Sequence, residues 1–168
     1  LGTGAIIVTT SDGSLTVAAT GVSIAGSGNI LLSAGETVEG TAADITLNAP
    51  VTSAAGNISL IAKDGVVQSA VGDVTTAGGT VDVKADGAIG MADGALTQTA
   101  GGNIRYEAGT AVPLAVADIT LGELNAGSGK AAVIATGSIL DLAVDTSAVD
   151  VTAADLIQIP TGPKTEAG

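Results

Sequence analysis

The feature of this sequence that most constrains its fold is a short repeated pattern: a Gly or Ala, then an Asn or Asp, then apolar and polar residues in alternation. The clearest copy runs Gly101-Gly102-Asn103-Ile104-Arg105-Tyr106-Glu107-Ala108. Gly and Asn tolerate positive φ and favour a turn, and the alternation after them is that of a β-strand with two different faces. Looser copies occupy residues 12–18, 28–34, 43–49, 56–62, 79–85 and 117–122. Such a chain is expected to be built by stacking repeats.

The direction of the strands decides which stacked fold is expected. No apolar residues recur at sustained helical spacing. The Asn-Gly dipeptide, the strongest short signal of a hairpin, is absent. In the repeats the Asn or Asp precedes the strand, which favours coils that run in the same direction. The sequence therefore predicts an all-β, right-handed parallel β-helix (β-solenoid) with coils of about 20–25 residues, and an antiparallel sandwich is the alternative.

The repeats set the expected domain boundaries. The β-helix segment is predicted over residues 1–159. Residues 160–168 have no apolar period and are predicted to be a linker or a frayed C-terminal tail. Residues 71–75 are predicted as a strand, Pro50 as a corner or strand start, and residues 112–114 as a small loop or bulge.

The core is expected to be narrow and aliphatic. Phe, Trp, His and Cys are absent, and Tyr106 is the single tyrosine. A thick core of ordinary type would use several aromatic residues. Tyr106 shares the face of Ile104 and is expected to fill the core or its edge, whereas Arg105 and Glu107 are expected to pair on the surface. The repeat positions predicted to be buried are Ile30, Ile45, Ile58, Val81, Ile104 and Ile119.

Residues that could carry chemistry are few. Without His and Cys, Cys–His nucleophilic pairs and His metal sites are excluded, and Ser59 and Ser138 are interpreted as surface or turn serines. The remaining catalytic option is a carboxylate pair, but the densest acidic run is interpreted as a solvated face with Asp150 pointing outward. That run comprises Asp141, Asp145, Asp150 and Asp155. We therefore expect no enzyme and no catalytic, cofactor-binding or metal-binding residue.

Calcium is the one cofactor that the acidic composition of this chain suggests. Acidic β-solenoids bind it where Gly-Gly-x-Gly-x-Asp repeats align carbonyls and carboxylates. That nonapeptide does not occur here, and Asp-Gly turns alone are a weak signal. Calcium is therefore an alternative to the expectation of no cofactor.

The charge of the chain bears on its partners. The net charge is −12, from seventeen acidic and five basic residues. Nucleic acid is excluded as an expected partner, because phosphate binding needs clustered Lys and Arg. No run approaches the ~18 apolar residues of a membrane helix, so membrane insertion is not expected.

Two segments carry a resemblance to a known group of proteins. Residues 56–60 and 87–104, which read GNISL and GAIGMADGALTQTAGGNI, resemble the repeats of filamentous-haemagglutinin-like adhesins and related giant β-strand-repeat surface proteins of bacteria. The resemblance implies an extracellular or cell-surface location, attached to the outer membrane, and a role in adhesion, biofilm or cell–cell contact. The expected function is therefore a structural stalk or fibre segment. The alternatives are a module that binds a glycan or host protein, through a flat face or the loop at 112–114, and a polysaccharide-active enzyme.

The two ends of the sequence resemble its middle. Residues 1–10 and 149–159 have the pattern of ordinary repeat strands, and no basic and apolar leader precedes the first. Because natural solenoids cover their terminal coils, we expect the chain to be a slice of a longer one. Its expected partners are further coils of the same chain, or other copies joined end to end, together with a glycan or cell-surface ligand.

Overall fold

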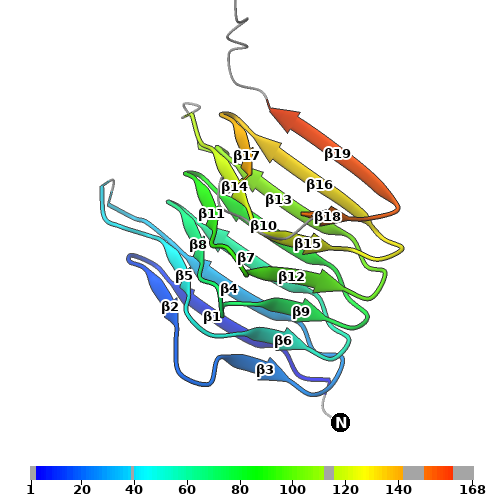
Figure 1. Ribbon diagram of the computed structural model, residues 1–168. Helices are drawn as coiled ribbons and strands as arrows, with labels where there is room; N and C mark the ends of the chain where they lie inside the picture. Colours follow the sequence, from blue (N-terminus) through cyan, green and yellow to red (C-terminus); the bar gives the residue numbers. More distant parts are fainter. Residues whose placement is uncertain (1–2, 39, 112–115, 142–149, 161–168) are drawn as a thin grey trace, which may run out of the picture.

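The fold is a stack of parallel β-coils. The computed structural model describes residues 3–38, 40–111, 116–141 and 150–160, and these residues form nineteen β-strands and no helix. The strands make three sheets, one on each side of the stack, and every recorded strand pairing is parallel. Figure 1 shows the coils rising from β1 to β19. This confirms the predicted all-β, right-handed parallel β-helix and rejects the antiparallel sandwich.

Each coil contributes one strand to each sheet, in the order A, B, C. Sheet A contains β1 (Ile6–Thr10), β4 (Ile30–Ala34), β7 (Ile58–Ala62), β10 (Val81–Ala85), β13 (Ile104–Ala108), β16 (Lys130–Ala135) and β19 (Asp155–Pro160). Sheet B contains β2 (Leu15–Val17), β5 (Ile45–Leu47), β8 (Val66–Gln68), β11 (Ile89–Met91), β14 (Ile119–Leu121) and β17 (Ile139–Asp141). Sheet C contains β3 (Val22–Ile24), β6 (Val51–Ser53), β9 (Val74–Thr76), β12 (Leu96–Thr99), β15 (Glu123–Asn125) and β18 (Val151–Thr152).

Equivalent residues stack directly on one another along each sheet. In sheet A one inward column consists of Ile6, Ile30, Ile58, Val81, Ile104, Ala131 and Leu156. The coils between these positions are unequal in length, and the longest, from Ile30 to Ile58, exceeds the predicted coil length. The extra length lies in the corners between sheets A and B, because ten residues separate β4 from β5 and β13 from β14, whereas three separate β7 from β8. The ladders stay in register because the corners absorb the difference.

The core consists of inward-facing aliphatic columns. All six repeat positions predicted to be buried are at most 2% exposed: Ile30, Ile45, Ile58, Val81, Ile104 and Ile119. Tyr106 is fully buried in the same core. A fully buried aliphatic side chain contributes roughly 1.5–3 kcal/mol, and the columns repeat this contribution in every coil.

The corner from sheet C to sheet A explains the Gly-Asn part of the repeat. Gly28, Gly56, Gly79, Gly102 and Gly129 stack there, and a Cβ on any of them would overlap the carbonyl oxygen of the glycine one coil below. None of these five has positive φ. The expectation that the Gly-Gly-Asn turn needs positive φ holds for Gly101 (φ 104°), but the glycine next to the Asn is required for close approach of two backbones.

The Asn of the repeat joins neighbouring coils. Asn29 Oδ1 accepts the Asn57 N–H at 2.8 Å, and Asn57 Oδ1 accepts the Thr80 N–H at 2.9 Å. Asp44 does the same at the start of sheet B, where its Oδ1 accepts the Gly65 N–H at 2.8 Å. These bonds explain why an Asn or Asp precedes so many of the strands.

Some local predictions change. The strand predicted over 71–75 is β9, which begins at Val74. Val71 is 62% exposed, because the chain turns at Gly72, whose N–H bonds to Ser69 O. β19 ends at Pro160, one residue beyond the predicted limit of 159. Pro50 immediately precedes β6, as predicted. The predicted loop at 112–114 and the tail after Pro160 lie outside the described residues.

Candidate functional site

The described members of the acidic run considered in the sequence lie apart from one another. Asp141 ends β17 in sheet B, Asp150 precedes β18 in sheet C, and Asp155 begins β19 in sheet A, so the three residues lie on different sides of the stack. Asp145 lies outside the described residues. Asp150 is half-buried, whereas Asp141 and Asp155 are exposed. Within the described ranges, no group of three or more His, Cys, Asp or Glu residues could hold a metal ion.

The two serines considered as nucleophiles also lie apart. Ser59 faces outward in the middle of sheet A, between Ile58 and Leu60, whose side chains are buried. Ser138 precedes β17, and its N–H donates to Asp118 Oδ1 at 2.6 Å. The chain contains no histidine that could serve as a base for either hydroxyl.

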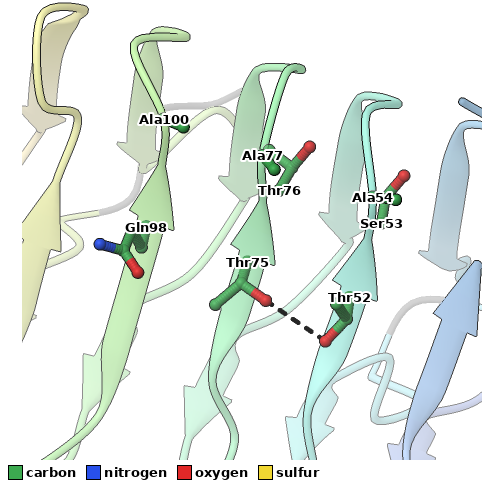
Figure 2. Close-up of a pocket in the computed structure, with 8 residues that line it drawn as sticks. All are labelled: Thr52, Ser53, Ala54, Thr75, Thr76, Ala77, Gln98 and Ala100. Carbon is green, nitrogen blue, oxygen red and sulfur yellow. Dashed lines mark hydrogen bonds between the residues drawn. The ribbon is translucent and has the colours of Figure 1, made fainter. Parts of the chain in front are cut away.

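The outer face of sheet C carries a shallow groove of about 330 Å³, which we call the sheet C groove. Its outward side chains are Thr52, Thr75 and Gln98, from three successive coils, with Ala54, Ala77 and Ala100 beside them (Figure 2). Thr75 Oγ1 lies within hydrogen-bonding distance of Thr52 Oγ1, at 3.3 Å. Ser53 and Thr76 also line the groove, but their side chains are buried at the corner.

The groove is part of a longer column. The strand pairings place one polar, uncharged residue at the same outward position in each of six coils, which we call the sheet C polar column: Ser23, Thr52, Thr75, Gln98, Asn125 and Thr152. Two residues further along each coil there is a second column of exposed small residues: Ala25, Ala54, Ala77, Ala100, Gly127 and Ala154. Neither column contains an ionisable side chain, in a chain of net charge −12.

Sheet A carries the opposite kind of surface. Arg105 binds Asp82 through two hydrogen bonds of 2.8 Å and lies 3.1 Å from Glu107 Oε2. The hydrogen bonds that Arg105 donates to the Asp82 carboxylate raise the pKa of Arg105. The predicted Arg105–Glu107 surface pair is therefore confirmed, and Asp82, one coil below, is an additional partner that the sequence did not reveal.

The other described basic residues also pair across coils. Lys63 lies 3.0 Å from Asp86, Lys84 lies 3.8 Å from Glu107, and Lys130 lies 3.4 Å from Asp155. All of these residues lie on sheet A or directly after one of its strands. Exposed pairs of this kind contribute little stability, but they neutralise part of the acidic charge on this side of the molecule.

A polar network crosses the interior and was missed by sequence reasoning. Gln68 from sheet B, Thr97 from sheet C and Tyr106 from sheet A are each at most 1% exposed. Tyr106 Oη lies 2.6 Å from Thr97 Oγ1 and donates to Gln68 Oε1 at 3.0 Å, and Gln68 Nε2 donates to Leu96 O at 3.0 Å. Burial raises the pKa of Tyr106 well above its ordinary value. Because these side chains are closed off from solvent, the network is structural.

The two ends of the described stack expose apolar surface. At the first coil, a cavity of about 240 Å³ lies among Val8, Leu15, Val17, Val22 and Leu32. At the other end, β19 pairs with β16 along one edge, and Leu156, which continues the inward column, is 43% exposed. Both ends of the described stack are therefore open cross-sections of the core.

Comparisons with protein-family models, with curated proteins and with solved structures each found no match for this chain. The described residues contain no helix that is long and apolar enough to span a membrane.

Proposed function

We propose that this chain is a non-enzymatic structural stalk segment of a bacterial surface or secreted filament, which works without a cofactor. The observation that carries this proposal is the continuity of the inward columns. The same inward positions are occupied from β1 to β16 by stacked side chains. Each coil thus packs only against its neighbours in the same way, and stacking such coils extends the molecule into a rod.

The surface supports the same function. The three described carboxylates of the acidic run lie on separate faces, Ser59 and Ser138 have no histidine base, and the interior network is closed to solvent. The resemblance of residues 56–60 and 87–104 to surface adhesins adds the proposed context, which is attachment to the outer membrane and a role in adhesion, biofilm or cell–cell contact.

The open ends suggest how the segment joins its neighbours. An exposed strand edge is a template for pairing with another strand, and both β1 and β19 have one unpaired edge in the described stack. Because every coil pairs with the next in the same parallel way, the free edge of β19 is complementary to the free edge of β1. We propose that the natural partners of the ends are further coils or a second copy, joined head to tail, and contacts of this type build open filaments.

Two variants of β19 test this mode of assembly. Leu156 belongs to the inward column and Ile157 to the outward face, and the two side chains are about equally exposed at 43% and 44%. Leu156→Lys places a charge on the stacking surface, whereas Ile157→Lys places it on the side of the rod. In sedimentation velocity at increasing protein concentration, the wild type and Ile157→Lys should form longer species, and Leu156→Lys should remain monomeric.

Electron microscopy should show these species as rods of constant width and increasing length. Equal loss of assembly in both variants would show that the contact is lateral. A wild-type protein that remains monomeric at every concentration would contradict assembly through the open ends.

A further inference from the structure

We propose that the sheet C groove binds a neutral polysaccharide strand that lies along the solenoid axis, across successive coils. This goes beyond the stalk function, because a rod needs no particular chemistry on one of its faces. Three properties of the groove carry the proposal: its charge, its hydrogen-bonding groups, and its size and repeat.

Charge selects against ionic ligands. The two columns of sheet C contain no ionisable side chain, and the described basic residues are on or beside sheet A, where each is paired with an acid. Asp73 and Glu123 lie at the side of sheet C where its strands begin. A polyanion such as a uronate chain would meet these carboxylates without a compensating cation, and a cationic chain would find no carboxylate within the groove. Of anionic, cationic and neutral ligands, a neutral ligand therefore suits the sheet C groove best.

The polar side chains of the groove can both donate and accept hydrogen bonds, as sugar hydroxyl groups can. The Thr75–Thr52 hydrogen bond leaves each hydroxyl with further capacity. Gln98 is exposed, and its amide offers two donors and an acceptor. The methyl groups of Ala54, Ala77 and Ala100 supply an apolar strip for the C–H surfaces of a sugar ring.

The size and the repeat of the groove fit a polysaccharide. A volume of about 330 Å³ is at the lower end of the range for small-ligand sites. Strands in a sheet are about 4.8 Å apart, which is close to the length of one sugar unit in an extended chain. A polymer of identical units can therefore meet the same groups on each coil.

The test uses the whole chain and short oligosaccharides of known linkage. Neutral β-1,4-linked hexasaccharides of glucose and of N-acetylglucosamine are titrated into labelled protein and followed by backbone NMR shifts, with a galacturonate hexasaccharide as the charged probe. We expect at least one neutral probe to bind with a Kd of about 1 mM, because no exposed aromatic ring is present in the groove to strengthen it. The shifts should centre on Thr52, Thr75 and Gln98, and the galacturonate should cause none there.

Matched variants locate the site. Thr75→Asp places a charge in the centre of the groove and should weaken binding at least tenfold, and Thr75→Val, which keeps the shape of the side chain, should weaken it severalfold. Thr46→Asp makes the same change at an outward position of sheet B and should leave binding unchanged. The absence of binding by any neutral probe up to about 10 mM, or equal binding of galacturonate, would overturn the proposal. Shifts of the groove residues with protein concentration alone would assign this face to a second copy of the chain instead.

Discussion

At the scale of single residues, the most unusual feature is the polar network inside an aliphatic core. Each member interrupts an apolar column: Gln68 stacks between Leu47 and Met91, and Tyr106 between Val83 and Val133. A buried polar group without a partner costs about 1–3 kcal/mol, so the three side chains depend on one another. They also come from three different sheets and three successive coils, and they therefore favour one relative placement of the coils.

Tyr106→Phe tests this dependence. The change removes the hydroxyl group while keeping the ring, so that Thr97 and Gln68 lose a shared partner inside the core. We expect the free energy of unfolding to fall by about 1–3 kcal/mol, measured by urea denaturation.

A triple variant is the matched control. Gln68→Leu, Thr97→Val and Tyr106→Phe together give each position the apolar character of its column neighbours. Replacing the interacting side chains together costs less than leaving one of them buried without its partner, so the triple variant should be more stable than Tyr106→Phe alone, although Leu96 O loses its bond from Gln68. If Tyr106→Phe is neutral, or if the triple variant is the less stable of the two, the network is not an interdependent unit.

At the scale of elements, the corner between sheets C and A determines how closely the coils approach. The glycine column leaves no room for a side chain, and buried hydroxyl groups complete the corner. Thr76 Oγ1 donates to Gly56 O at 2.8 Å and accepts the Gly79 N–H at 3.1 Å. Ser53 makes the corresponding two bonds one coil below, at 3.0 and 2.8 Å.

Gly79→Ala should therefore be strongly destabilising. Its Cβ would overlap Gly56 O, which is backbone and cannot move without separating the coils. We expect a loss of about 2–4 kcal/mol, at or beyond the upper end of the range for overpacking, measured by thermal or urea unfolding.

Gly90→Ala provides the comparison. Gly90 faces outward in β11, and nothing lies within 4 Å of the position of an added Cβ. Alanine in a strand is favoured over glycine by about 0.5–1 kcal/mol, so this variant should be neutral or slightly more stable. Similar losses in the two variants would show that the corner is not the tight point of the coil.

The element scale also shows what could be predicted from the sequence. The alternation after an Asn or Asp identified β4, β7 and β13 of sheet A and β5 and β14 of sheet B with their buried residues, because a period of two is visible over each of these repeats. Strands β6 and β15 of sheet C were not predicted, since no Asn or Asp immediately precedes them and a strand of three residues shows little alternation by itself. The sheet C groove depends on the pairing of residues from different coils, such as Thr52 with Thr75, and variable corner lengths conceal that register. The Gln68–Thr97–Tyr106 network was hidden for the same reason.

At the scale of the whole molecule, charge is distributed by face. Sheet A carries the ion pairs, the columns of sheet C are neutral, and the net charge remains −12. Self-repulsion of this size opposes side-by-side contacts between rods at neutral pH. It opposes contacts between rods most strongly at low ionic strength, since salt screens exposed charges.

Lowering the pH should remove this repulsion. As the carboxylates become protonated, the net charge approaches zero near the calculated isoelectric point of about 4.1. We expect light scattering to rise as the pH falls from 7 towards 4, because uncharged rods associate. Scattering that stays flat over this range would contradict the view that acidic repulsion keeps the sides of the rods apart. Leu156→Lys, measured in parallel, separates association at the ends from association along the sides.

The variable corners described for the longer coils have an evolutionary consequence. The long coil from Ile30 to Ile58 and the shorter one from Ile58 to Val81 fit into the same ladders, since the difference lies in the corners, mainly between β4 and β5, and never enters a sheet. A gene encoding this chain can therefore gain a coil by an imprecise duplication, provided that the join falls in a corner. Duplications that end in a corner leave every existing column intact. The length of the rod can therefore change within a lineage while the fold stays the same.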